Sequence, residues 1–314
     1  MTGSAKSLRI GTRGSPLALA QAILVRDALA AAHPDLPRAD IAVIKTTGDR
    51  VQDRKLDEIG GKGLFTKEIE EALADGRIDL AVHSMKDMAT FLPEGLAIAC
   101  LLKRADPRDA LFSPHAKSLA GLARGAKVGT SSLRRQAQIL ALRPDLNVVA
   151  LRGNVGTRLA KLAAGTVDAT LLALAGLIRL GLADKATAIL STEEMLPAVA
   201  QGAIGVEIRA GDSSTRALLA PLDDFATELA VNAERACLAV LDGSCHTPIA
   251  ALAEHDSKGA LRLRSLIALP DGSALRRDER QGPARSIAEA IALGRAAGEA
   301  LRRDAGPAFA AIWS

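Results

Sequence analysis

The chain has 314 residues and a formal net charge of +4, and 48% of its residues are hydrophobic. This composition predicts a folded globular protein with room for two or three domains and excludes a disordered chain. No apolar run is long enough to span a membrane, and MTGSAKSLRIGTR at the start lacks the apolar core of a secretory signal, so we expect a cytoplasmic protein.

Strand and helix patterns alternate from residue 8 onward. The predicted strands are LRIGTR (8–13), ADIAVIKT (39–46) and IDLAVHS (78–84). Ser15 and Pro16 begin a predicted helix that runs to about His33, with serine as the N-cap and proline in the first turn. LFTKEIEEALADG (64–76) has the apolar spacing of an amphipathic helix. This alternation predicts an α/β sheet with helices on both faces.

The same pattern begins again near residue 127. KVGTSSLRRQAQILALR (127–143) and LNVVALRGNVGTRLAKLAAG (146–165) each contain a strand, a turn and a helix. GTRGSPLALAQ and GTSSLRRQAQ are similar, because each joins a strand end to a helix through a Gly-Thr turn that contains serine. We therefore predict two similar α/β lobes that direct helix N-termini at a common cleft, where unpaired N–H groups attract anions.

The pattern changes after about residue 223. A helix (226–241) is followed by strands at 249–255, 261–272 and 274–282, and a helix from about 286 to 303 comes last. This order is typical of an α+β domain. The loop DGSCHTP (242–248) joins its first helix to its sheet.

Several arginines lie at predicted strand ends or in the first turn of the next helix: Arg13, Arg134, Arg135, Arg152 and Arg158. Ligands bind at this edge of open α/β sheets, and the arginine fork pairs with carboxylates and phosphates. The pattern therefore predicts an anion site, although a GC-rich coding genome would also raise the arginine content. Lys62 in GGKG fits beside them, and the spacing of a P-loop is absent.

The stretch VHSMKDM (82–88) ends a strand with His83, Lys86 and Asp87 close together. A carboxylate beside cations would be ionised and able to stabilise a developing positive charge or exchange a proton. An ion-paired turn is the alternative interpretation. For His83, we expect a hydrogen-bonded side chain at the strand end.

Cys245 lies in the DGSCHTP loop. A metal site would need further ligands, which are missing around Cys245 and His246. A Cys-His pair for acyl transfer is the other alternative, but adjacent side chains of an extended loop point in opposite directions. Cys100 and Cys237 fall within apolar patterns and are expected in the core. Three irregularly spaced cysteines also argue against a disulfide framework.

Taken together, these motifs resemble the porphobilinogen deaminase family, also called hydroxymethylbilane synthases. The matching stretches follow the family's order along nearly the whole chain: RIGTRGSPLALAQ, GGKGLFTKEIEEAL, DLAVHSMKD, RADPRDAL, VGTSSLRRQ, LRGNVGTRL, LALAGLIRLGL, LPAVAQGAIGVE and GSCHTPI. The resemblance implies two periplasmic-binding-protein-like α/β domains that flank a cleft, plus a smaller α+β C-terminal domain. Domain 1 would comprise residues 1–102 and 201–222, domain 2 residues 103–200, and domain 3 residues 223–314.

The resemblance also implies a transferase of haem and tetrapyrrole biosynthesis. It would condense four porphobilinogen molecules head to tail, releasing ammonia, onto a dipyrromethane cofactor attached to Cys245 by a thioether. Water would then release the linear tetrapyrrole hydroxymethylbilane. The expected partner is porphobilinogen, with no nucleic acid, membrane or metal, and the expected state is a cytoplasmic monomer.

Site residues follow from the matching motif positions. The resemblance implies that Asp87 is catalytic, holding pyrrole N–H groups and stabilising positive charge. It assigns cofactor binding to Ser15, Lys86, Asp87, Thr130, Ser132, Arg134 and Arg135. It assigns substrate binding to Arg13, Lys62, Phe65, Arg152, Arg158, Arg179 and Gln201. Glu58, Ala89 and His246 depart from the usual pattern of the family.

Three other functions stay open from the residues alone. A solute-binding protein would use the anion cleft without chemistry, but it predicts a signal peptide and gives Cys245 no use. A cysteine acyl-transferase would be labelled by an ester and carry no chromophore. A nucleic-acid binder would show salt-sensitive DNA affinity, which the aromatic content of 2% and the charge of +4 disfavour.

Overall fold

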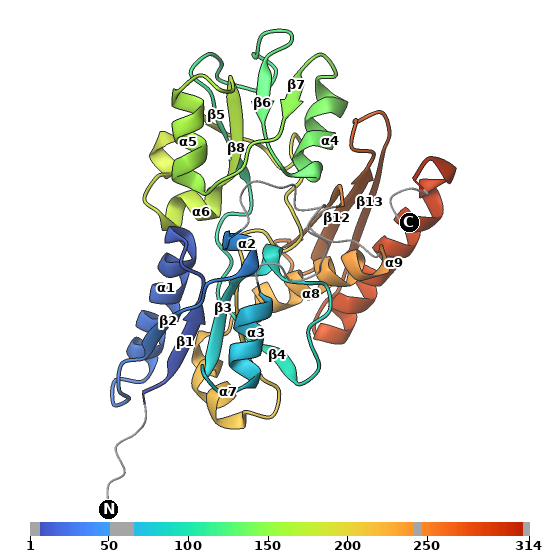
Figure 1. Cartoon of the computed structure of the whole chain (residues 1–314). Helices are drawn as coiled ribbons and strands as arrows, with labels where there is room; N and C mark the ends of the chain where they lie inside the picture. The colour runs from blue at the N-terminus through green and yellow to red at the C-terminus, as the bar shows by residue number, and fades with distance from the viewer. Residues whose placement is uncertain (1–6, 51–65, 242–246, 310–314) are drawn as a thin grey trace, which may run out of the picture. The chain divides into compact units, whose positions relative to one another are not determined.

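A computed structural model of the chain describes residues 7–50, 66–241 and 247–309 (Figure 1). The chain divides into two compact units. Unit 1 comprises Met1–Arg104 and Ala203–Thr227, and unit 2 comprises Ala105–Gly202 and Glu228–Ser314. Unit 2 thus holds residues of both predicted domains 2 and 3, and the division into three domains stays a prediction.

Unit 1 is built on a five-stranded sheet in the order β2-β1-β3-β10-β4. Its strands are β1 (Arg9–Thr12), β2 (Asp40–Val43), β3 (Leu80–Ser84), β4 (Leu96–Leu101) and β10 (Ile204–Arg209). Strand β1 runs parallel to β2 and β3, whereas β10 is antiparallel to both β3 and β4. Periodicity did not predict that β10 belongs to this sheet, because the chain returns to it only after forming a second sheet.

Helices cover both faces of this sheet because side chains alternate along β3. Leu80 and Val82 pack with α1 (Pro16–Ala32), while Ala81 packs with α3 (Lys67–Ala74). Helix α1 begins where its sequence predicts, since Ser15 Oγ accepts a hydrogen bond from the Ala18 backbone N–H at 3.3 Å. The remaining helical segments in the described part of the unit are α2 (Thr47–Arg50), η2 (Met85–Asp87), α7 (Ser213–Leu219) and η4 (Ala220–Leu222).

The second sheet repeats the pattern of strand directions of the first. It runs β7-β6-β8-β5-β9, with β6 parallel to β7 and β8, and β5 antiparallel to β8 and β9. Its strands are β5 (Asp109–Phe112), β6 (Lys127–Gly129), β7 (Asn147–Val149), β8 (Ala169–Ala173) and β9 (Ala188–Ile189). The helical segments beside it are α4 (Leu133–Leu142), α5 (Val155–Ala163), α6 (Leu174–Arg179) and η3 (Ala183–Lys185).

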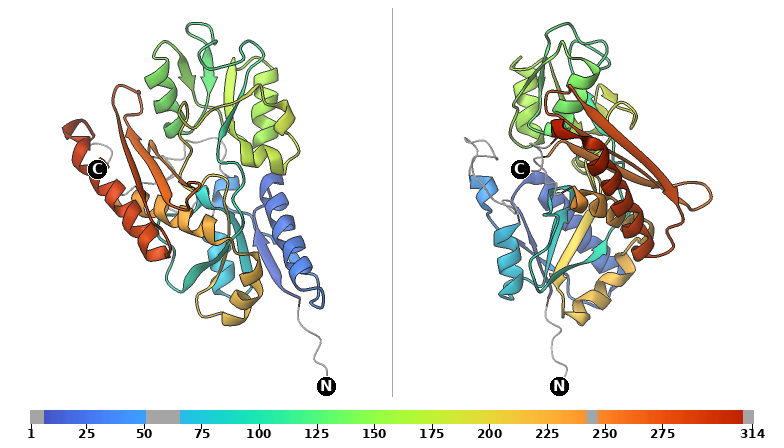
Figure 2. Two further views of the ribbon diagram at one scale, coloured as in Figure 1. Left: turned by 180° about the vertical axis from the view of Figure 1, so that it is seen from behind. Right: turned by 90° about the vertical axis from the view of Figure 1, so that its right-hand side faces the viewer.

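The C-terminal part is an antiparallel sheet in the order β11-β12-β13. Its elements are α8 (Phe225–Val240), β11 (Ile249–His255), β12 (Leu261–Ala268), β13 (Leu275–Gly282), α9 (Ile287–Ala305) and η5 (Pro307–Phe309). Helix α9 packs along β12 and β13 (Figure 2). Leu252 and Leu266 of this sheet join Ala137 of α4 in one apolar cluster. The predicted class, two α/β sheets followed by a smaller α+β part, is confirmed.

Candidate functional site

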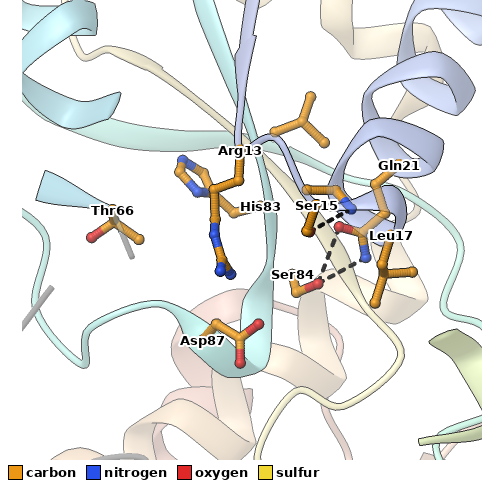
Figure 3. Close-up of a pocket in the computed structure, with 10 residues that line it drawn as sticks. Arg13, Ser15, Leu17, Gln21, Thr66, His83, Ser84 and Asp87 are labelled. Carbon is orange, nitrogen blue, oxygen red and sulfur yellow. Dashed lines mark hydrogen bonds between the residues drawn. The ribbon is translucent and has the colours of Figure 1, made fainter. Parts of the chain in front are cut away.

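A pocket in unit 1 lies where β1 and β3 end. Its lining includes Arg13, Ser15, His83 and Asp87 (Figure 3). Arg13 directly follows β1, and Asp87 lies on the 3₁₀ turn η2 that directly follows β3. Since β1 and β3 are parallel, their carboxyl ends meet at one edge of the sheet, where α/β proteins bind ligands. The structure thus brings together three residues that the motifs single out: Arg13, Ser15 and Asp87.

Asp87 contributes an exposed carboxylate to this pocket. Figure 3 shows the side chains of Arg13 and Asp87 extending into the same space. Asp87 is exposed, and no hydrogen bond or ion pair to another described residue holds its carboxylate. Lys86 precedes it on the same turn. An ionised carboxylate in this position is available to accept N–H groups of a ligand or to stabilise a positive charge.

Two further polar residues line the pocket and were given no role by the sequence. Gln21 Nε2 donates a hydrogen bond to Ser84 Oγ at 2.8 Å, which fixes both side chains at the end of β3 (Figure 3). Gln21 lies on the face of α1 toward the sheet and is 2% exposed. A glutamine on the otherwise apolar face of the predicted helix could have indicated that this side chain needs a polar partner.

His83 forms a buried pair with Glu207 of β10. The His83 Nε2 and Glu207 Oε2 atoms lie 3.1 Å apart, and the side chains are 5% and 0% exposed. The nearby Glu70 of α3 is half-buried, and this burial raises its pKa, with the Glu207 carboxylate adding to the effect. The sequence favoured a hydrogen-bonded His83 but did not reveal Glu207, because β10 was not expected from the pattern.

A buried charge cluster in unit 2 contains two of the predicted cofactor-binding residues. Asp109 pairs with Arg134 Nη2 at 2.8 Å and with Arg135 Nη2 at 2.6 Å, and it is 0% exposed. Gln201 Nε2 donates to the same carboxylate at 3.0 Å. Arg134 Nη1 and Arg135 Nη1 donate to the backbone oxygens of Leu196 and Leu171. The role of Asp109 was missed, although two arginines on a buried helix face require a counter-charge.

The remaining predicted residues of unit 2 lie in the turns and helices that follow its parallel strands. Thr130 follows β6, and its Oγ1 accepts a hydrogen bond from the backbone N–H of Ser132, the N-cap of α4. Arg152 and Arg158 flank the start of α5, and Arg158 Nε donates to the Gly153 oxygen at 2.8 Å. Arg179 ends α6, and burial lowers its pKa to about 10.

Three predicted site residues, Lys62, Phe65 and Cys245, lie outside the described residues. Cys100 and Cys237 are both buried, and neither forms a disulfide with another described residue. Among the described residues, no group of three His, Cys, Asp or Glu side chains is arranged to hold a metal ion. None of the described helices combines the length and hydropathy needed to cross a membrane.

Two family models together match most of the chain. Residues 8–217 match "Porphobilinogen deaminase, dipyromethane cofactor binding domain", and residues 228–303 match "Porphobilinogen deaminase, C-terminal domain". The chain belongs to the porphobilinogen deaminase family. It is therefore an enzyme of tetrapyrrole biosynthesis with a dipyrromethane cofactor binding domain, as the motifs implied.

Two similar porphobilinogen deaminases agree with this family, and one solved structure is reported beside them. A porphobilinogen deaminase from Paracoccus denitrificans is 57% identical over 308 residues, covering 98% of this chain and 97% of that protein. A chloroplastic porphobilinogen deaminase from Oryza sativa subsp. japonica is 55% identical over 305 residues, covering 96% of this chain and 85% of that protein. A solved nutrient binding protein from Burkholderia cenocepacia, bound to methionine, shares 16% identity with a TM-score of 0.42, covering 68% and 90% of the two chains.

Proposed function

We propose that this porphobilinogen deaminase condenses four porphobilinogen molecules head to tail, with release of ammonia, and then frees hydroxymethylbilane by hydrolysis. Growth would start on a dipyrromethane group held through Cys245 by a thioether. The observation that carries the proposal is the pocket that places Arg13 and Asp87 at the carboxyl ends of two parallel strands. A guanidinium suits the substrate carboxylates, and a carboxylate suits the pyrrole N–H.

The buried arginines of unit 2 fit a group that carries carboxylates. The Nε atoms of Arg134 and Arg135 and Nη1 of Arg152 are buried and have no hydrogen-bond partner among the described residues. Asp109 offers one negative charge to the two guanidinium groups that it contacts, so a positive charge is left over. An acetate or propionate would both satisfy free N–H groups and balance this charge.

The residues proposed to hold the cofactor are Cys245, Ser15, Lys86, Asp87, Thr130, Ser132, Arg134 and Arg135. The bound group supplies a ring carbon to which the first substrate is joined. Lys86 and the arginines would bind and orient its carboxylates, because their positive charges offset the cost of taking those carboxylates out of water. Ser15 and Ser132 cap α1 and α4, so the same residues also place helix N-termini that favour anions.

The residues proposed to bind porphobilinogen are Arg13, Lys62, Phe65, Arg152, Arg158, Arg179 and Gln201. Each pyrrole carries an acetate and a propionate, so a growing chain needs many cationic partners. Asp87 would accept hydrogen bonds from the pyrrole N–H and stabilise the positive charge that develops when the amine leaves. Removing an electrostatic partner of this kind typically costs on the order of a hundredfold in rate.

We further propose the three-domain layout, with domain 1 at 1–102 and 201–222, domain 2 at 103–200 and domain 3 at 223–314. A cytoplasmic monomer that uses neither nucleic acid nor a metal completes the proposal. The absence of further partners follows from a reaction that needs only porphobilinogen and water. Light scattering of the purified protein would measure the oligomeric state directly.

Intact-protein mass spectrometry tests the proposed attachment. The protein as expressed, or after incubation with porphobilinogen, is expected to exceed its sequence mass by two linked pyrrole units. The Cys245→Ser variant should lack this excess, while Cys237→Ser, which changes a buried thiol, should retain it. If a folded wild-type protein never gains the mass, or if Cys245→Ser also gains it, the proposed attachment is wrong.

A further inference from the structure

The face of the unit 1 sheet that packs against α3 contains an unexpected pair of buried polar side chains. Along β3 and β10, Val82, Val206 and Ile208 belong to the cluster on the opposite, α1 face. Alternation therefore places His83 and Glu207 on the α3 face, and their hydrogen bond agrees with this. Apolar residues would fill this space at lower cost, so the polar pair calls for an explanation.

Glu207 fixes the orientation of the His83 ring. The Glu207 carboxylate is 0% exposed, and its Oε1 atom has no hydrogen-bond partner among the described residues. Its Oε2 atom accepts most favourably from a protonated Nε2 of His83, 3.1 Å away. The Nδ1 atom then becomes the free nitrogen, and it makes no hydrogen bond to another described residue.

His83 also belongs to the pocket that contains Asp87. It is 5% exposed, and it lines this pocket together with Arg13 and Asp87 (Figure 3). The charged groups near it come from four parts of the chain: Glu207 on β10, Glu70 on α3, Arg13 after β1, and Asp87 on η2. A carboxylate-oriented imidazole in a ligand pocket is the arrangement that serves proton transfer in many enzymes.

The proposed reaction requires such a group. The aminomethyl group, protonated as an ammonium, leaves as ammonia with the electron pair of the broken C–N bond, and this ammonia takes up one proton to become ammonium. A pyrrole ring carbon loses one proton when the new C–C bond forms and its ring regains aromaticity. The two events balance, so a residue that carries the proton from carbon to nitrogen needs no outside acid or base.

We propose that His83, oriented by Glu207, is the acid–base residue that carries this proton, an inference that rests on the proposed function. In one half of the cycle, neutral Nδ1 accepts the proton from the ring carbon as the C–H electron pair returns to the ring. In the other half, the imidazolium Nδ1–H gives its proton to the departing ammonia. Glu207 keeps Nε2 protonated throughout and stabilises the imidazolium between the two steps.

Kinetics of His83→Gln give the first test, with His33→Gln as the matched control. His33, also in unit 1, donates a hydrogen bond from Nε2 to the Leu218 backbone oxygen at 2.8 Å and does not line the pocket. After correction for the cofactor-loaded fraction measured by mass, His83→Gln should lower kcat by about a hundredfold. KM should stay within about threefold, because binding is unchanged. The His33→Gln variant should retain the kcat of the wild type.

The pH profile separates this role from a structural one. One half of the cycle needs the neutral ring of His83 and the other needs its imidazolium, so the wild-type kcat should decline toward both acid and alkaline pH, and His83→Gln should lack this dependence. A kcat of His83→Gln equal to that of the wild type, or an unchanged pH profile, would overturn the inference. If wild-type protein itself releases no ammonia from porphobilinogen, the proposed function fails instead.

A spectroscopic test needs no activity. The chain has five histidines, so nitrogen-15 labelling of histidine gives a simple spectrum in which His83→Gln identifies the His83 signals. At alkaline pH, wild-type His83 should be entirely the Nε2–H tautomer, and Glu207→Gln should populate both tautomers. Observation of the Nδ1–H tautomer in the wild-type protein would overturn the inference, even if either variant proves too unstable for kinetics.

Discussion

Asp109 sets the charge balance of a buried cluster in unit 2. Its two oxygens contact Arg134 and Arg135, and none of the three side chains is more than 6% exposed. Burial alone would raise the pKa of Asp109, but the two guanidinium groups lower it far below its ordinary value. The carboxylate is therefore ionised at neutral pH, and each arginine has a partner.

Replacing Asp109 by asparagine should destabilise the protein strongly. Asp109→Asn leaves two buried guanidinium groups without their counter-charge, a loss that typically costs about 3–5 kcal/mol of unfolding free energy. Urea denaturation would measure it. Asp145→Asn is the matched control, because its partner Arg143 is better exposed and binds three backbone oxygens as well. Equal losses in the two variants would contradict this account of the cluster.

The same carboxylate predicts a pH dependence of stability. A carboxyl whose pKa is lowered by folding contributes stability above its unfolded pKa of about 3.9, and this contribution is lost as pH falls through the folded value. The difference in unfolding free energy between wild type and Asp109→Asn should therefore be largest near neutral pH and narrow below about pH 4. Denaturation curves at several pH values test this. A difference that widens toward acid pH would be inconsistent with an ionised Asp109.

Asp87 should matter for turnover and little for folding. Its carboxylate is exposed and unpaired within the described residues, so Asp87→Asn should melt at the wild-type temperature. Loss of the charge opposite the developing cation should lower kcat by about a hundredfold or more. Product formation and thermal melting would be measured on the same sample, with exposed Asp75→Asn as the control. Product formation by Asp87→Asn at nearly the wild-type rate would contradict the role proposed for Asp87.

At the scale of elements, two glycines allow α9 to approach α8 closely. A Cβ at position 298 would lie 2.7 Å from Val240 Cβ and 2.8 Å from the Cys237 oxygen. At position 294 it would overlap the backbone oxygen of Ala233. Each glycine weakens α9 by about 1 kcal/mol relative to alanine, so close packing must compensate.

Gly294→Ala should therefore destabilise the protein despite its better helix propensity. A backbone oxygen cannot move aside as a flexible side chain can, so overpacking should cost about 1–3 kcal/mol. Chemical denaturation would measure this. Gly282→Ala is the control, since its added Cβ would meet only Leu293 Cδ1 at 3.7 Å, an ordinary contact. A higher unfolding free energy of the Gly294→Ala variant would show that the two helices can move apart without cost.

Elements with strong local signals could be predicted from the sequence. Ser15 and Pro16 located the start of α1, and Ser286 precedes the observed start of α9 at Ile287. The strand predicted at 39–46 is shorter, Asp40–Val43. Strand β9 has two residues, too few to show a period, and β10 pairs with strands more than a hundred residues earlier in the chain. Such pairing depends on tertiary contacts that no local pattern contains.

The sequence predicted only those parts of the candidate site that lie at the ends of predicted strands. Arg13 and Asp87 meet because β1 and β3 are parallel neighbours, which the alternating pattern implied. The sequence did not show that Arg134 and Arg135 contact Asp109, because that requires knowing that β5 lies beside β8 near α4. Their binding to the cofactor stays a prediction, with their Nε atoms as the groups left for it.

At the scale of the whole molecule, the chain uses one sheet design twice. In both five-stranded sheets three parallel strands are followed by one strand that is antiparallel to both of its neighbours, and the fifth strand runs in the direction of the first three, although the strands come in a different order along the chain. In each unit a serine N-cap, Ser15 or Ser132, begins the helix that follows a parallel strand. The repeated GT turns in the sequence correspond to this shared geometry, which offers each unit an anion-binding helix terminus.

Cofactor loading should consequently raise the stability of the whole protein. In the unloaded protein, the excess positive charge around Arg134 and Arg135 has no carboxylate to balance it beyond Asp109 among the described residues. Charge-assisted hydrogen bonds to a ligand carboxylate contribute about 1.5–3 kcal/mol each. For a domain of 150–250 residues, each kcal/mol raises Tm by about 2–4 °C, so loading should raise Tm by several degrees.

Thermal unfolding of mass-verified samples would measure this effect. Loaded wild type should melt above unloaded wild type, and Cys245→Ser should melt with the unloaded protein even after incubation with porphobilinogen. Moderate salt should leave the difference largely intact, because buried pairs are screened much less than exposed ones. Equal melting temperatures of loaded and unloaded protein would mean that the buried arginines are balanced without the cofactor, and Asp109 would then be sufficient as their counter-charge.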